Sequence, residues 1–383
     1  MGSLVLVPDI KVVKEGILKD KRKALVYMSV FILLLTAVIF TYHNYFMYDK
    51  TIAKVIEVEN SFDHEETSEE GVVEKYYIQD ITAIIKNGEY KGSSIKLTNK
   101  YSYSGVNDEK YKKGNDLFIT AKESAGGVTG SIISVKRDKY IAIALAIFIM
   151  AILLVSGKKG LLAVFSLVIN ISLFIYALDL YSKGENIIFL CNMLIIAFSI
   201  SSLVLVSGIN RQTFVAIIST LLSMAAVYVI YNIALRFGEQ PEYMMMEYIS
   251  RAEDLEHIFM AGVLIGGLGA VMDVAISISV AVNELINKDK NISVKALVLS
   301  IKEIGYDIMG TMINVLFFSY MCGTIPMMIL KIKNGYPLYS ILRFQIPFEI
   351  IRFLLGSIGI VLAIPISGLV SVLIMKGRSK VND

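Results

Sequence analysis

One acidic residue stands inside an apolar segment, and several small residues share its helical face. The segment GGLGAVMDVAIS, residues 266–277, carries a single charge at Asp273. Positions three and four apart share a face of a helix, and this face collects Gly262, Gly266, Gly269, Ala270, Asp273, Ser277, Ala281 and Glu284. A carboxylate facing lipid costs at least about 2.5–3.5 kcal/mol, and small residues let a second helix approach closely. The pattern predicts that this face lies at the centre of a helix bundle, where Asp273 can bind a cation or a proton.

A second polar face follows in YDIMGTMINVLFFSYMCGTIP, residues 306–326. Helical spacing groups Asp307, Gly310, Thr311 and Asn314. If the two helices run antiparallel, Asn314 should be roughly level with Ser277. The glycines expected to pack against other helices are Gly262, Gly266, Gly269 and Gly310. The residues expected to carry transport or ion coupling are Asp273, Ser277, Glu284, Asp307 and Asn314.

A charged pair lies near the start of the last apolar run. Glu349 and Arg352, in PFEIIRFLLGSIG, are three residues apart, a spacing that allows an ion pair on one helical face. Long side chains at such a position reach the membrane interface and keep their charged ends in water. We therefore expect a structural ion pair between Glu349 and Arg352.

The elements that position these residues are apolar runs of membrane-spanning length. Hydrophobic residues make up 55% of the 383 residues, and the mean hydropathy is +0.63. A run of about 18 or more residues with few charges indicates a transmembrane helix. Eight runs qualify, at Ala24–Tyr42, Tyr140–Ser156, Gly160–Leu180, Asn186–Gly208, Thr213–Leu235, His257–Leu285, Tyr306–Leu330 and Phe353–Met375. The sequence predicts an α-helical polytopic membrane protein with about eight transmembrane helices.

Lysine and arginine residues indicate which connections are cytoplasmic, because they resist translocation. They gather before the first run, at residues 158–159, at Arg211, between residues 288 and 302, and after residue 375. We therefore expect both termini in the cytoplasm and residues 44–138 outside. The linker NKDKNISVKALVLSIKEIG, residues 287–305, alternates lysines with apolar residues at helical spacing, which predicts an amphipathic helix on the cytoplasmic membrane surface.

Between the first two runs, the sequence becomes polar and alternates with a period of two. In SSIKLT, Ile95 and Leu97 face one way and the residues between them the other, as in a half-buried strand. Five such runs, separated by turn residues such as Asn87-Gly88, predict a small all-β domain of the OB-like barrel type. It has no ladder of aromatic residues along a basic groove, so we expect no nucleic-acid binding.

The sequence lacks the motifs of several enzyme classes. GKKG after Ser156 has neither the upstream glycine nor the following hydroxyl residue of a phosphate-binding loop. There is no H-E-x-x-H, and the three histidines are scattered. An intramembrane aspartyl protease needs two opposed aspartates, whereas Asp307 is expected at the interface and only Asp273 deep in the bilayer. We expect no enzyme activity, no cofactor and no metal site.

Three blocks of the sequence resemble, in order and spacing, the signature blocks of the YibE/F-like family of bacterial membrane proteins: GGLGAVMDVAISIS, DIMGTMINVLFFSYMCGTIPMMIL and EIIRFLLGSIGIVLAIPISGL. The resemblance covers most of the chain from the second run onward, and the β-domain resembles the family's amino-terminal half. It implies a multi-pass protein of the bacterial plasma membrane, for which a permease role is commonly suggested. Directly after Asn314 the second block reads VLFFSYMCG, where the family resemblance implies a second threonine or a more polar run, and this departure argues against a hydroxyl relay through this helix.

Two functional hypotheses of different class follow. In the first, the protein is a gradient-driven transporter or permease of a small solute or ion, and Asp273 is the coupling carboxylate. In the second, it is a non-transporting sensor or assembly factor whose β-domain binds an envelope protein. Under either hypothesis the protein is expected to contact the lipid bilayer, and the sequence also allows an oligomer. The expected divisions are a cytoplasmic N-terminus (1–23), an anchor helix (24–43), an extracytoplasmic β-domain (44–138), a seven-helix bundle (139–376) and a cytoplasmic tail (377–383).

The charge distribution generates a topology prediction. A cysteine placed at Ser61, in the β-domain, should react with a membrane-impermeant thiol reagent in intact cells, whereas one at Ser293 should react only after the cells are opened. Mass spectrometry of the purified variants measures the labelling. Labelling at position 293 but not at position 61 in intact cells would invert the topology.

Overall fold

A computed structural model describes residues 21–67, 71, 73–105, 108–124, 127–237, 243 and 255–376. The chain divides into two compact units, Met1–Gly157 and Lys158–Asp383. Residues 1–20 of the predicted cytoplasmic N-terminus (1–23), the predicted tail 377–383 and residues 238–254 except residue 243 lie outside the described residues.

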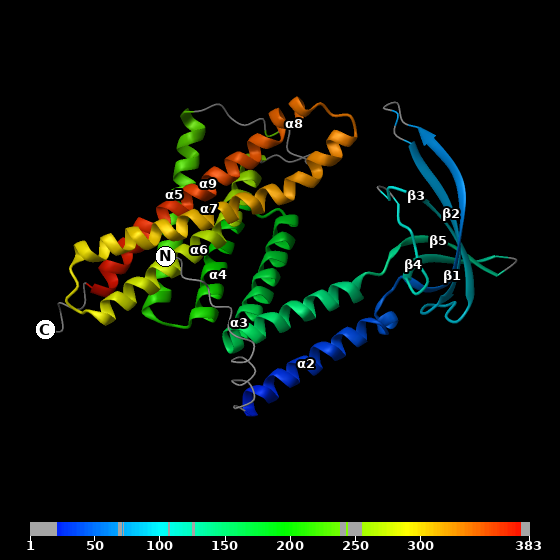
Figure 1. Cartoon of the computed structure of the whole chain (residues 1–383), viewed down its shortest axis with the longest axis horizontal. Helices are drawn as coiled ribbons and strands as arrows, with labels where there is room; N and C mark the ends of the chain where they lie inside the picture. The colour runs from blue at the N-terminus through cyan, green and yellow to red at the C-terminus, as the bar shows by residue number, and fades with distance from the viewer. Residues whose placement is uncertain are drawn as a thin grey trace. The chain divides into compact units, whose positions relative to one another are not determined.

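The polar region of the first unit folds as a five-stranded antiparallel sheet (Figure 1). Its strands are β1 (Thr51–Thr67), β2 (Val73–Ile85), β3 (Ser94–Ser102), β4 (Asp116–Ser124) and β5 (Gly127–Val135), in the order β3-β2-β1-β4-β5. As predicted, Ile95 and Leu97 are buried while Lys96 is exposed. The sheet is strongly curved, as the approach of its two edge strands shows. A β-carbon at Gly130 of β5 would lie 3.3 Å from Ile95 Cδ1 of β3. The hydrogen-bonded order of the described strands is that of an open sheet, with β3 and β5 at its edges.

Two helices of the first unit flank the sheet in sequence. They are α2 (Lys21–Thr41) and the first part of α3 (Asp138–Ser182). Helix α3 merges two predicted runs, but Gly157 breaks it with a φ of 56° that only glycine adopts readily. The break matters because 45 helical residues would extend about 67 Å, roughly twice the hydrocarbon thickness. Tyr27 of α2 reaches this break, since its hydroxyl lies 3.3 Å from a β-carbon built at Gly157.

Two lysines are buried where the sheet meets these helices. Lys136 Nζ donates to the Thr41 carbonyl at 2.7 Å and pairs with Asp138. Lys139 similarly pairs with Asp116, at 3.3 Å. Each buried ammonium group thus has a carboxylate partner, and losing that partner would be strongly destabilising.

The Asn87 side chain adds four hydrogen bonds at the same junction. It accepts from the Ile52 amide at 2.6 Å and donates to the carbonyls of Tyr45, Tyr48 and Lys50, each at 3.0 Å. Burial and the Asp116 carboxylate raise the pKa of Tyr45, so its hydroxyl remains a donor to Asp116. The turn η1 (Asn44–Met47), which follows α2, is thereby held against the sheet.

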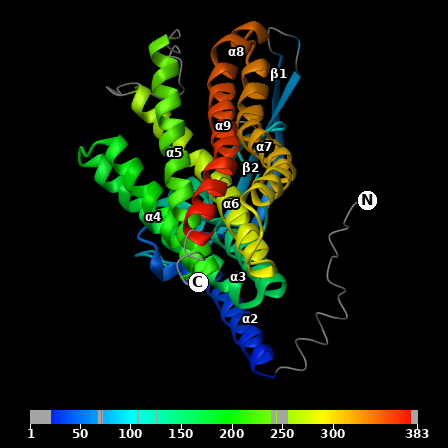
Figure 2. The same cartoon turned by 90° about the vertical axis from the view of Figure 1, so that its left-hand side faces the viewer.

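The second unit is a helical bundle built around one helix. Besides the second part of α3, it holds α4 (Ile187–Ser207), α5 (Arg211–Phe237), α6 (Leu255–Lys288), α7 (Val294–Lys333), α8 (Leu338–Phe344), α9 (Ile346–Ser371) and the π-helical turn η3 (Val372–Lys376). Helix α6 packs against α4, α5, α7 and α9 (Figure 2). Capping fixes where two of the helices begin, because Asn186 accepts from the amides that open α4 and Ser293 from the amide of Ala296 in α7.

Six of the described helices are long and apolar enough to cross a membrane, and α2 contributes a shorter apolar helix at Leu25–Thr41. Residues from Val294 onward of the predicted surface helix 287–305 are helical, but they form the start of α7 and not a separate helix. Leu297 and Ile301 are buried there. Ile301 lies against α9, since its Cγ2 is 3.0 Å from a β-carbon built at Gly368. Leu297 and Ile301 thus meet protein, whereas Val294, Val298 and Leu299 are exposed.

The buried junction generates a stability prediction. Lys136→Met should destabilise the β-domain by about 3 kcal/mol, because it leaves Asp138 without its cation and this carboxylate is one-quarter exposed. Protease resistance of the domain in the full-length protein, measured against temperature, should fail about 10 °C or more below the wild type. Lys122→Met, on the exposed face of β4, is the control and should behave as the wild type. Equal resistance of both variants would contradict the anchoring role.

Candidate functional site

The face of α6 that carries Asp273 is open in the structure. The positions on this open face of α6 are all exposed: Gly262, Gly266, Gly269, Asp273, Ser277 and Glu284. A β-carbon at Gly262 or at Gly269 would meet no atom within 4 Å. The expectation that the glycines of this face form the central helix contact is therefore wrong for Gly262 and Gly269, whereas Gly266 lies against Tyr320 of α7.

The opposite face of α6 makes the close contacts. Gly267 lies against α9, because a β-carbon built on it would be 3.4 Å from Gly356 Cα. A β-carbon at Gly359 would lie 3.1 Å from Val227 Cγ2 and from Val271 Cγ2. The glycines that allow close packing thus belong mainly to α9, while α6 supplies branched side chains that fill the space. Two helices can pack closely when small residues lie on only one of them. The stripe of small residues on α6 therefore did not show that α9 supplies most of the glycines at the contact.

Helix α7 has a matching open face. Its members Asp307, Gly310, Thr311 and Asn314 are exposed, and Gly310, the fourth predicted packing glycine, also has open space around it. A β-carbon at Gly266 would lie 2.5 Å from the Tyr320 hydroxyl, so α6 and α7 are adjacent at this level. Counting six residues along each antiparallel helix brings Asn314 level with Met272, beside Asp273. By this count Asn314 lies about five residues along α6 from Ser277, with which the sequence predicted it to be roughly level.

Some polar side chains on these two faces form hydrogen bonds within the protein, and others do not. Asn314 donates to the Gly310 carbonyl at 2.8 Å, and Thr311 donates to the Ile308 carbonyl at 2.9 Å. The carboxylate of Asp273 has no hydrogen bond or ion pair with any described residue, and the same holds for Asp307 and Glu284. An exposed, unpartnered carboxylate can accept a cation, a proton or water without first breaking an internal bond.

A charged pair on α9 lies beside the N-terminal part of α6. Arg352 Nη1 of α9 donates to Glu349 Oε1 at 2.7 Å, so the ion pair expected from the spacing is present. The guanidinium carbon also lies 5.2 Å from the ring centroid of Phe259, a cation–π contact. The Tyr320 hydroxyl is buried and has no hydrogen-bond partner among the described residues. The contacts of Arg352 with Glu349 and Phe259 fit a structural role, although Arg352 Nε, like the Tyr320 hydroxyl, is buried without a partner among the described residues.

Sequence reasoning missed a set of buried hydroxyls between α5, α6 and α9. Ser219, Ser279 and Ser367 are fully buried. Val227, Val271 and Gly359 meet at one level of the bundle, and each serine is eight residues from the one of these three that belongs to its own helix. Helical geometry therefore places the three serines at a common level as well. Ser279 donates to the Ala275 carbonyl, while Ser219 and Ser367 have no partner within the described part of the chain. Serines within otherwise apolar runs were the available signal, because hydroxyls there usually face protein.

The acidic residues of the open faces do not cluster. Within the described ranges, no group of three or more His, Cys, Asp or Glu side chains is arranged to hold a metal ion. Asp273, Asp307 and Glu284 therefore belong to no such group.

Comparison with protein families places both units. A family model described as YibE/F-like protein matches residues 144–377, which is more than half of the chain. A second model, described as the YibE/F family N-terminal domain, matches residues 46–135. No curated protein and no solved structure matches the chain.

The packing of α6 generates a paired prediction. Gly359→Leu should lower the melting temperature of the detergent-purified protein strongly or prevent its folding, because even a β-carbon there is tight against two valine methyl groups. Gly269→Leu should leave the melting temperature nearly unchanged, because its side chain enters open space. Equal losses in the two variants would show that the face of Gly269 is covered by packed protein.

Proposed function

The chain belongs to the YibE/F-like family, and from that premise we propose that it is a gradient-driven transporter or permease of a small solute or ion. The observation that carries this proposal is Asp273. Its carboxylate stands near the middle of the 34-residue α6, on an open face, without a partner among the described residues. A charge at such a depth is costly in lipid. The cost falls if water, a cation or a proton reaches the carboxylate, which is what a transport path supplies.

The surroundings of Asp273 support a path along α6 and α7. The open face of α6 offers glycines and Ser277 on either side of the carboxylate, and small residues leave room for a solute beside the backbone. The open face of α7 adds the side-chain oxygen of Asn314 at the level of Asp273. In this proposal Asp273 binds the coupling ion or proton, and Ser277 and Asn314 line the path, with Asp307 and Glu284 toward its cytoplasmic end.

Coupling to a gradient follows from the two states of a carboxylate. Ionised Asp273 attracts a cation or a proton from one side of the membrane, and the neutralised form is cheaper to carry through an apolar environment. A protein that exposes this group alternately to the two sides can therefore link ion movement to solute movement. No enzymatic step is part of the proposal.

We propose eight membrane crossings for this protein, in the bacterial plasma membrane. Support comes from α3, which Gly157 divides into two segments of spanning length, and from α2. Both termini would then lie in the cytoplasm, in agreement with the distribution of lysine and arginine residues.

For the β-domain we propose an OB-like barrel that faces outward. The order β3-β2-β1-β4-β5, together with the approach of β5 to β3 at Gly130, supports closure of the curved sheet. In the second candidate function, this domain binds an envelope protein, the helical bundle is its scaffold, and the protein acts as a sensor or assembly factor. That function requires no titration of Asp273, so the two candidates differ in a measurable way.

The decisive variant is Asp273→Asn, which keeps the side-chain shape and removes the charge. We expect normal expression and melting temperature but at least a tenfold loss of flux in proteoliposomes screened with small ions and solutes, while Asp273→Glu retains part of it. Glu185→Gln, in the exposed turn before α4, is the control and should keep full flux. Full flux in Asp273→Asn would remove the coupling role.

A second measurement needs no known substrate. A hydrophobic carbodiimide modifies protonated carboxyl groups in apolar surroundings, so it should label Asp273 in the purified protein, and less at high pH or with a bound cation. Peptide mass spectrometry locates the adduct. Absence of labelling at every pH, with Asp273→Asn behaving as the wild type, would favour the scaffold function.

A further inference from the structure

A cavity of about 430 Å³ opens in the first unit, where α2 ends and the sheet begins. Its lining combines cationic and aromatic side chains: Lys86, Lys91, His43, Tyr45, Tyr48 and Phe46. Two of the lining lysines come from the β2–β3 turn, whose Asn87 is fixed by its four hydrogen bonds. The cavity is therefore built on an anchored part of the domain.

The two lysines of this cavity are electrostatically available. Neither Lys86 nor Lys91 forms an ion pair with a described residue, in contrast to Lys136 and Lys139, which are buried and paired. Two nearby carboxylates are engaged, because Asp116 and Asp138 accept hydrogen bonds from tyrosines and pair with those buried lysines. Asp49, which follows Tyr48, and Glu89, in the β2–β3 turn, are not part of the lining. The cavity consequently presents an excess of positive charge that is suited to an anion.

The position of the cavity relative to α2 identifies the kind of anion. It begins two residues after the apolar helix ends at Thr41, where a membrane-spanning α2 meets the head-group region. Phe46 is 76% exposed and Met47 63% exposed in the same turn. Exposed apolar side chains beside tyrosines and lysines are typical of the membrane interface.

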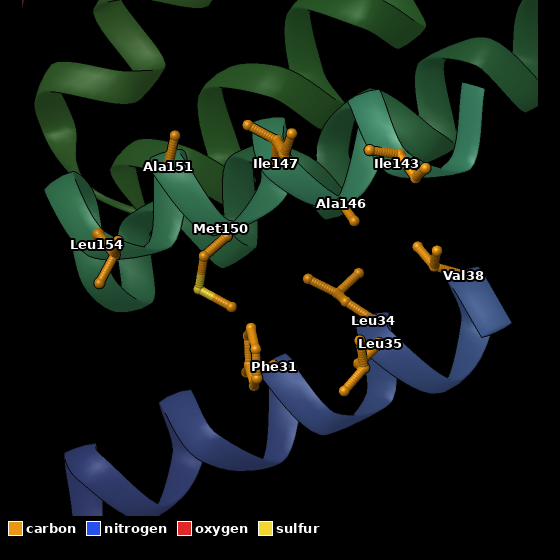
Figure 3. Close-up of a pocket in the computed structure, with 10 residues that line it drawn as sticks. All are labelled: Phe31, Leu34, Leu35, Val38, Ile143, Ala146, Ile147, Met150, Ala151 and Leu154. Carbon is orange, nitrogen blue, oxygen red and sulfur yellow. The ribbon is translucent and has the colours of Figure 1, made fainter. Parts of the chain in front are cut away.

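A second cavity continues this arrangement toward the membrane interior. It measures about 500 Å³, lies between α2 and the first part of α3, and has only apolar lining residues (Figure 3). Leu34 and Met150 point into it from the two helices. Its end at Val38 is five residues before His43, about 7 Å along the helix. The first unit therefore has an apolar cavity at acyl-chain depth and a cationic one at head-group depth, in succession along α2.

We propose that the first unit binds a phospholipid of net negative charge, with an acyl chain between α2 and α3 and its phosphate at Lys86 and Lys91. Lysine ammonium groups bind phosphate as point charges, and anionic lipids attract lysines near the membrane surface by about 1 kcal/mol each. Tyr45 and Tyr48 border the head group, and Phe46 enters the interface. The inference rests on the proposed membrane crossing of α2 but is independent of transport.

The test compares melting temperatures of the full-length protein in detergent with added phosphatidylglycerol, phosphatidylcholine or inorganic phosphate. Phosphatidylglycerol at saturating concentration should raise the melting temperature by about 5 °C, and the other two should have little effect. Lys86→Gln/Lys91→Gln should abolish the shift while leaving the melting temperature without lipid unchanged. The matched control Lys96→Gln/Lys122→Gln removes two exposed charges from β3 and β4 and should keep the shift.

A further variant tests the acyl-chain part and does not depend on the lysines. Ala146→Phe places a ring in the apolar cavity and should also abolish the shift from phosphatidylglycerol. An undiminished shift in the double lysine variant or in Ala146→Phe would overturn the proposal. An equal shift with inorganic phosphate would also overturn it, because the site would then bind free phosphate. Loss of flux in Asp273→Asn bears only on transport, so the two proposals fail separately.

Discussion

The close approach of α9 to α6 is the contact on which the bundle depends. Gly356 and Gly359 of α9 leave room for Gly267 and Val271 of α6, and Val227 of α5 closes the same layer. In a membrane the hydrophobic effect does not drive helices together, so dispersion contacts at short distance have to supply the stability. Once α6 uses this face for α5 and α9, its other face is left for a different purpose. That face carries Asp273.

This division of α6 explains why a carboxylate is compatible with a central helix. A charged group within the packed α6–α9 contact would need a buried partner, and an unpaired one would be strongly destabilising. On the open face Asp273 is exposed and does not disturb the packed layer. Helix α7 contributes to the same arrangement, because Tyr320 touches α6 at Gly266 while Asn314 lies beside the level of Asp273. The close packing of α6 and its exposed carboxylate therefore lie on opposite sides of the helix.

In the first unit, a polar sheet is attached to two apolar helices. Buried charges perform this attachment: Lys136 with Asp138, and Lys139 with Asp116. Asn87 ties the turn after α2 to the sheet. These groups are paired internally, whereas Lys86 and Lys91, which line the cavity of the same junction, form no ion pair with a described residue. The same turn that ends β2 thus contributes both to anchoring and to the cationic cavity.

The sequence alone determined the class of this protein, its apolar helices and the alternation of its strands. The alternation of the strands, as in Ile95 and Leu97, and the length of the apolar runs are local properties of the sequence. They are the same in any spatial arrangement of the elements. It also determined the Glu349–Arg352 pair, because both partners belong to one helix. The tertiary structure decided which face of α6 is packed, that residues from Val294 onward continue into α7, and how Asn314 aligns with Asp273. Small residues permit both close packing and an open path, so their spacing is the same in either case. Only the side chains brought in by α5, α7 and α9, distant in the sequence, distinguish the two.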